Sequence, residues 1–137
     1  MNKFIKSFGW AMHGLRTVWQ EEVNFRIEIG ISLAVIALGI YFKFITLEWI
    51  ILIACIGAVL TAEIVNTVVE DLCNKVEPNH DPLIGKVKDM MGGFVLLVAF
   101  FVGIIGVLLF FRIFLEPNTF FQFSKFCPDN VTIGTTF

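Results

Sequence analysis

Charged residues are scarce in this chain of 137 residues, and three cysteines are spread along it. Asp, Glu, Lys and Arg make up 16% of the residues, against about 25% in soluble domains. The net charge of −2 gives no electrostatic reason to expect nucleic acid as a partner. The cysteines form no CxxC pair, so neither a zinc site nor a disulfide framework is indicated.

Long apolar stretches take the place of the missing charge. The chain is 57% hydrophobic, which excludes a disordered protein. Residues 90–111 contain no charge at all, and residues 29–45 are interrupted only by Lys43. About 20 apolar residues cross the ~30 Å hydrocarbon layer of a bilayer. We therefore predict an all-α integral membrane protein with spans at about 27–45, 48–70 and 89–112.

The first 22 residues have a different pattern, in which apolar and basic side chains alternate at helical spacing. Phe4, Phe8, Leu15 and Trp19 recur on one side, with Lys3, Lys6 and Arg16 between them. Basic amphipathic helices with aromatic residues are typical of the membrane surface. We predict a surface helix over 1–22; the alternative is a soluble helix packed on a core.

The distribution of Lys and Arg predicts the orientation in the membrane. Basic residues concentrate before the first span and in the loop 71–89. The positive-inside rule places both segments in the cytoplasm, and the 43–48 hairpin outside. Residues 1–115 are taken as one domain, and the tail 116–137 shows no clean period and is assigned no structure.

One polar cluster lies on the second predicted span, directly after fourteen uncharged residues, 49–62. Glu63, Asn66 and Glu70 fall within about 60° of one helical face. A carboxylate deep in a membrane costs roughly 2.5–3.5 kcal/mol, so two of them on one face predict a buried functional site. The alternative is a hydrogen-bonding network that joins helices.

Two further clusters flank the first and third spans. Glu22 and Arg26 are four residues apart, a spacing that favours an interfacial salt bridge. Lys88 and Asp89 open the third predicted span, where a helix N-terminus suits a phosphate and a metal. The alternative for this pair is a snorkelling lysine beside an aspartate that complements the helix dipole.

Together the three clusters supply carboxylate oxygens and cations for phosphoryl transfer. Mg²⁺ prefers carboxylate oxygens together with substrate phosphates. Phosphoryl transfer needs chiefly positioning, metal neutralisation and a base. The chain contains no GxxxxGK[ST] loop and no protein-kinase signature. Any nucleotide site would therefore be built from helix side chains.

These residues resemble the small prokaryotic diacylglycerol kinase family, which also includes undecaprenol kinases. The matching strings are Gly14-Leu-Arg16, Trp19, Glu22-x-x-Phe25-Arg26-x-Glu28, Glu63-Ile-x-Asn66-Thr67-x-x-Glu70 and Gly85-Lys86-x-Lys88-Asp89. The resemblance covers roughly residues 3–112. It implies a multi-pass kinase of the bacterial inner membrane that uses ATP and Mg²⁺, acts on a lipid alcohol and forms a homotrimer.

The resemblance also implies a role for each site residue. Glu63 is expected to be the general base, and Glu22 and Glu70 the Mg²⁺ ligands. The residues expected to bind ATP are Trp10, Glu22, Glu70, Lys88 and Asp89. Arg26 and Asn66 are expected to support the site or contact the substrate.

Several alternatives remain at this stage. The acceptor is diacylglycerol, giving phosphatidate, or undecaprenol, giving undecaprenyl phosphate. A non-catalytic ion or proton pathway would use the same buried carboxylates without ATP. Met90, Met91 and Phe94 are bulky where the family has small residues, so a degenerate family member is a third alternative.

Overall fold

The structure, a computed structural model, describes residues 2–79 and 81–115. Within these ranges the backbone forms four helices, α1 (Asn2–Glu21), α2 (Val23–Tyr41), α3 (Thr46–Val76) and α4 (Pro82–Leu115). The all-helical prediction is therefore confirmed. The tail 116–137, which was predicted as a separate segment, lies outside the described residues.

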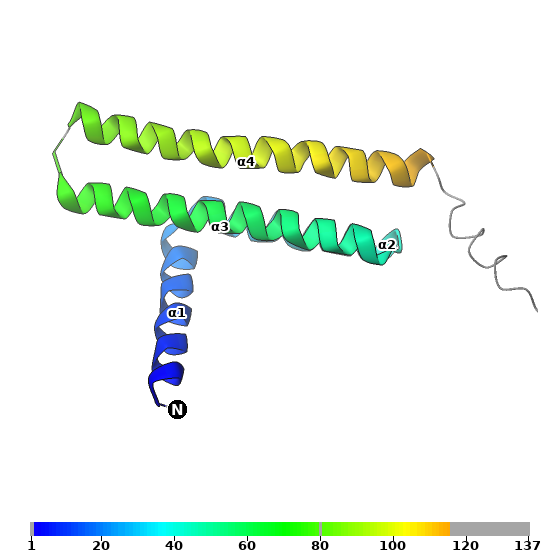
Figure 1. Cartoon of the computed structure of the whole chain (residues 1–137), viewed down its shortest axis with the longest axis horizontal. Coiled ribbons are helices and arrows are strands. Elements are labelled where there is room, and N and C mark those ends of the chain that lie inside the picture. Colours follow the sequence, from blue (N-terminus) through cyan, green and yellow to red (C-terminus); the bar gives the residue numbers. More distant parts are fainter. Residues whose placement is uncertain (1, 80, 116–137) are drawn as a thin grey trace, which may run out of the picture.

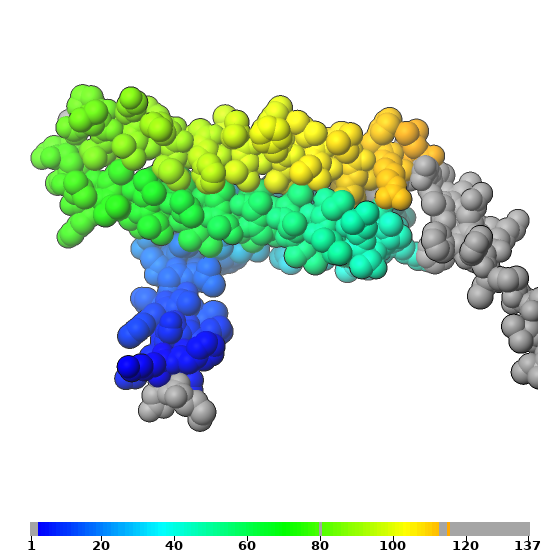
Figure 2. Space-filling view, viewed as in Figure 1, coloured from blue at the N-terminus to red at the C-terminus, as the bar shows by residue number. Residues whose placement is uncertain are grey.

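The four helices form a long bundle with one projecting arm. α3 packs against both α2 and α4, and α1 contacts α2. In Figure 1, α4 runs alongside α3, α2 lies behind α3, and α1 leaves the bundle at a steep angle. Figure 2 shows α4 lying along α3 over most of its length. We call the end at residues 42–45 the turn end and the end at residues 77–81 the loop end.

Three of these helices are long and apolar enough to cross a membrane. They are Val23–Tyr41, Thr46–Val76 and Pro82–Arg112. Their number agrees with the three predicted spans. Helices suit this setting because each backbone N–H and C=O within a helix is satisfied inside its own segment, where lipid offers no partner.

The helix ends differ from the predicted span limits. α2 ends at Tyr41 because Lys43 takes a φ of 56°, in the left-handed region that cannot continue the helix. α3 continues beyond residue 70 to Val76, and α4 begins at Pro82 rather than near 89. Apolar content marks where a chain crosses a membrane, whereas a helix can continue into the polar flanks.

A close approach at the turn end depends on Gly39. A Cβ at this position would lie 3.1 Å from the ring of Trp49 and 3.3 Å from the ring of Phe44. The Phe44 ring also contacts Phe110 of α4, with ring centroids 5.9 Å apart. Aromatic contacts therefore join α2, α3 and α4 at this end.

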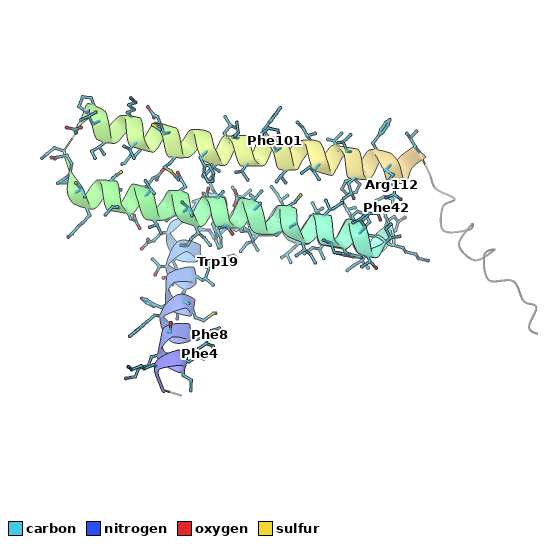
Figure 3. The ribbon with its side chains drawn as sticks, viewed as in Figure 1. Phe4, Phe8, Trp19, Phe42, Phe101 and Arg112 are labelled. Atoms are coloured by element: carbon cyan, nitrogen blue, oxygen red, sulfur yellow. The ribbon has the colours of Figure 1, made fainter. Side chains whose placement is uncertain are left out.

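Glu48 of α3 supplies the polar contacts of the turn end. Its Oε2 accepts a hydrogen bond from the Ile45 backbone N–H at 2.8 Å, which satisfies one of the free N–H groups where α3 starts. Its Oε1 lies 3.5 Å from Arg112 Nη1 of α4. In Figure 3, Arg112 lies beside Phe42 at this end of the bundle.

α1 carries large exposed apolar side chains. Phe4 is 80% exposed and Trp10 is 73% exposed. Figure 3 shows Phe4, Phe8 and Trp19 spaced along this helix. Of the helix predicted over 1–22, the structure shows Asn2–Glu21, and its placement on a membrane surface remains a prediction.

The bulky residues after Lys88-Asp89 do not press on the neighbouring helix. Met90 is 65% exposed and Phe94 is 46% exposed. Within a single chain the volume of these two side chains therefore lies largely outside the contact between α3 and α4, whereas Met91 is partly buried.

We expect Glu48→Ala to destabilise the protein by about 2 kcal/mol, because a buried carboxylate with two partners is lost. Arg112→Ala should destabilise it by less than about 1 kcal/mol, because the arginine is half exposed and Glu48 keeps its backbone bond. Thermal unfolding in detergent compares the two variants. Equal shifts would contradict a capping role for Glu48.

Candidate active site

The polar face of α3 is the centre of the candidate site. Glu63 is buried, with 2% of its surface exposed, and Thr67 is buried one turn later. Thr67 Oγ1 donates to the Glu63 backbone oxygen at 3.0 Å. Asn66 Nδ2 donates to Glu70 Oε1 at 3.2 Å. The structure thus brings Asn66 and Glu70 together, on the turns that follow Glu63, as their spacing predicted.

The junction between α1 and α2 brings further polar groups to this face. Glu22 separates the two helices with an extended backbone, at φ −100° and ψ 116°. The charges of Glu22 and Glu70 act on the Glu63 carboxylate, and the Asn24 side chain interacts with it. The charge of Glu63 also acts on the Glu28 carboxylate. Carboxylates from two helices therefore concentrate negative charge around Glu63.

Three buried oxygens of this cluster have no hydrogen-bond partner among the described residues. They are Glu28 Oε2, Glu63 Oε1 and Asn66 Oδ1. An unsatisfied buried polar group costs about 1–3 kcal/mol, so native proteins seldom keep several in one place. These oxygens are suited to accept a hydrogen bond from a bound hydroxyl or to face a cation.

The carboxylates also suit a divalent metal that shares its ligands with a substrate. Among residues 2–79 and 81–115, no group of three or more His, Cys, Asp or Glu residues gathers closely enough to hold a metal alone. Mg²⁺ usually takes one or two protein carboxylates and completes its shell with phosphates and water. Glu22 and Glu70, whose charges both act on Glu63, are the two carboxylates that could meet that smaller requirement.

Arg26 does not form the ion pair with Glu22 that their spacing suggested. Its Nη1 donates to the backbone oxygens of Trp19 at 3.0 Å and Gln20 at 3.1 Å. The prediction was wrong because Glu22 interrupts the helix, so that positions 22 and 26 are not one turn apart on a continuous helix. Arg26 instead satisfies carbonyls at the C-terminus of α1.

The sequence analysis placed Lys88 and Asp89 at the start of the third span, but in the structure they lie six and seven residues after the start of α4. α4 begins at Pro82, where Asp81 Oδ1 accepts hydrogen bonds from the backbone N–H groups of Leu83 and Ile84 at 2.7 and 3.2 Å. Lys88 Nζ donates to Asn74 Oδ1 of α3 at 2.6 Å. Asp89 is exposed.

Sequence reasoning gave no role to four polar residues of this region, namely Asn24, Glu28, Thr67 and Asn74, although Glu28 and Thr67 belong to the matching strings. The signal for three of them was present, since Asn24 and Glu28 lie beside Glu22 and Thr67 follows Asn66. Trp10, expected at the nucleotide, is exposed on the projecting helix α1. The structure therefore groups Glu22, Glu63, Asn66 and Glu70, and leaves Trp10 and Asp89 open to their surroundings.

An apolar cavity of about 460 Å³ lies between α2, α3 and α4. Glu28 lines it on the side of the carboxylate cluster, and Phe44 and Phe110 line it at the turn end. The rest of its wall is apolar apart from Ser32 and Cys55. Pockets of this volume hold small-molecule ligands. One carboxylate of the cluster, Glu28, therefore lines a partly open apolar cavity between the helices.

Comparison with known proteins decides the family. A family model for prokaryotic diacylglycerol kinases matches residues 9–110. The chain belongs to this family. The match covers all the site residues discussed above and confirms the resemblance carried by the motifs.

The similar proteins within the family have two named activities. An undecaprenol kinase of Bacillus subtilis (strain 168) is 32% identical over 110 residues, which cover 80% of this chain and 89% of the relative. A diacylglycerol kinase of Escherichia coli (strain K12) is 28% identical over 103 residues, covering 75% and 84%. The diacylglycerol kinase of Haemophilus influenzae is 27% identical over 112 residues, covering 81% and 95%.

We expect Arg26→Gln to loosen the end of α1, because two backbone carbonyls lose their charged donor. Hydrogen exchange of the amides in the last turn of α1 should become several-fold faster, because the bonds are solvent-exposed and an ordinary hydrogen bond contributes about 0.5–1.5 kcal/mol. Arg16→Gln, on the exposed part of α1, is the control. Equal exchange in both variants would contradict the proposed contact.

Proposed function

We propose that this protein is a membrane lipid kinase that transfers the γ-phosphate of ATP to the hydroxyl of a lipid alcohol. The observation that carries the proposal is the buried Glu63, whose Oε1 has no partner among the described residues and whose neighbouring carboxylate Glu28 lines an apolar cavity. The hydrocarbon part of an acceptor suits the cavity, and its hydroxyl suits the carboxylates. Family membership supports the same activity.

In the proposed reaction Glu63 is the general base. Its unpartnered Oε1 accepts the proton of the lipid hydroxyl as the hydroxyl oxygen forms a bond to the γ-phosphorus. The bond from this phosphorus to the β–γ bridging oxygen breaks, and ADP leaves. A base at membrane depth is required because the acceptor hydroxyl belongs to a lipid.

The remaining site residues hold the phosphate donor. Glu22 and Glu70 would hold Mg²⁺, which neutralises phosphate charge when it is bound. Lys88 would bind a phosphate oxygen through its ammonium group. Asp89 and Trp10 would complete the ATP site, and Asn66 would support Glu70, to which it already donates.

Diacylglycerol is the first candidate acceptor, with phosphatidate as the product. Undecaprenol is the second candidate, and the 32% identity with an undecaprenol kinase, compared with 28% for a diacylglycerol kinase, supports it.

We further propose a homotrimer in the bacterial inner membrane, with the N-terminus and the 71–89 loop in the cytoplasm. No residue in the apolar window of α4 is fully buried, which leaves surface on this helix for other copies and for lipid.

We expect purified protein to transfer labelled phosphate from ATP to one of these two lipids in mixed micelles. Glu63→Gln should lower the rate by 10²-fold or more, because a positioned base contributes about 10²–10⁴-fold. Glu48→Gln is the matched control, since it changes a second buried carboxylate on the same helix about 22 Å away. Full activity of Glu63→Gln would exclude it as the base.

No transfer to either lipid by folded protein, together with no binding of ATP, would favour the non-catalytic ion or proton pathway. Transfer to one lipid alone would identify the acceptor.

We expect Glu22→Ala and Glu70→Ala each to raise the Mg²⁺ concentration needed for half-maximal activity, because each removes one carboxylate ligand. A shift of about tenfold corresponds to 1.4 kcal/mol of binding free energy. Glu21→Ala, which removes an exposed carboxylate next to Glu22, is the control. An unchanged metal titration in the first two variants would count against both residues as ligands.

A further inference from the structure

The polar face of α3 continues past Glu70 to Asn74. Glu63, Thr67, Glu70 and Asn74 are spaced by four, three and four residues, so they follow one another along one side of the helix. At a rise of 1.5 Å per residue, this face extends about 16 Å from Glu63 to Asn74. Asn74 therefore lies at the loop end of the same face that carries the carboxylates.

Asn74 is also the point at which α4 brings its cation to α3. Lys88 Nζ lies 2.6 Å from Asn74 Oδ1, and Lys88 is half-buried whereas Asn74 is exposed. Within residues 2–79 and 81–115, two polar contacts between side chains link α3 and α4. The second is the pair Glu48–Arg112, at the opposite end of the bundle.

A neutral acceptor suits a lysine that is to bind phosphate. The ammonium group has three donors, and the bond to Asn74 uses one of them. The other two remain available, and the amide does not cancel the positive charge. A carboxylate in the same place would compete with phosphate for that charge.

We propose that Asn74 is a positioning residue, which holds the Lys88 ammonium at the loop end of the carboxylate face so that it meets the phosphates of ATP. This inference rests on the proposed kinase function. Lysine has a flexible four-carbon stem with large rotamer entropy. Fixing the ammonium before ATP arrives removes part of the ordering that binding would otherwise require.

The kinetic test is Asn74→Ala. An intramolecular hydrogen bond contributes about 0.5–1.5 kcal/mol, so the KM for MgATP should rise about two- to tenfold. The KM for the lipid should not change. Asp71→Ala, which truncates an exposed polar side chain on the preceding turn, is the control and should leave both constants unchanged. An unchanged KM for MgATP in Asn74→Ala would overturn the proposal.

A double-mutant cycle separates positioning from a general structural effect. If Asn74 acts through Lys88, then Asn74→Ala combined with Lys88→Ala should raise the KM for MgATP no further than Lys88→Ala alone. Additive effects would overturn the proposal. Asn74→Asp should also raise this KM, because the new carboxylate would compete with the ATP phosphate for the Lys88 ammonium.

The reactivity of the Lys88 amine tests the contact with Asn74 without enzymatic turnover, and therefore independently of the proposed kinase function. The amine of Lys88 must leave Asn74 before it can react, so labelling by an amine-reactive reagent should be faster in Asn74→Ala than in the wild type. Mass spectrometry of the Lys88 peptide measures this rate in the absence of ATP. Equal rates would overturn the contact, whereas a wild type that transfers no phosphate would overturn the kinase proposal.

Discussion

The burial of Glu63 is the constraint on which the rest of this structure depends. A lone carboxylate at membrane depth costs several kcal/mol, and Glu63 is almost completely enclosed. Helix α3 must therefore keep its polar face against α2 and the start of that helix, away from lipid. The break at Glu22 follows from the same requirement, because it turns α1 away and lets α2 bring Asn24 and Glu28 to Glu63. Arg26 then stabilises the break by binding the carbonyls that α1 leaves free.

The two ends of the bundle are held by different kinds of contact. At the turn end, Glu48 is bound by a backbone N–H and by Arg112, and aromatic rings pack around Gly39. Both carboxylate oxygens of Glu48 therefore have a partner at the turn end. Near Glu63, by contrast, three buried side-chain oxygens have no hydrogen-bond partner among the described residues. Stability and chemistry are thus separated along α3. Among the described residues, the buried side-chain oxygens without a partner belong to Glu28, Glu63 and Asn66, and none of them lies at the turn end.

Much of the fold could be predicted from the sequence because the bilayer limits the choices. An apolar run of about twenty residues has to be a helix, since lipid offers no partner for backbone groups. The polar face of α3 could be predicted as well, because spacing within one helix fixes relative direction. The contacts of Arg26 and Lys88 could not. The contact of Arg26 depends on the helix break at Glu22, which the hydrophobic periodicity of the sequence does not indicate. The contact of Lys88 depends on how far α4 is shifted along α3. That shift follows from packing and from the start of α4 at Pro82, which apolar content alone did not place.

The order of groups along α3 matches the physical difference between the two substrates of the proposed reaction. A phosphate donor is charged and arrives from water, so its cationic contact belongs at the helix end, where Asn74 holds Lys88. A lipid alcohol arrives within the membrane, so its base belongs deeper, near Glu28, which lines the apolar cavity. Glu70 lies between them, where a metal would contact the phosphates and face the reacting oxygen. One helix can arrange Asn74, Glu70 and Glu63 in this order because its rise per residue is constant. About 16 Å of one face separates Asn74, at the loop end, from the proposed base Glu63.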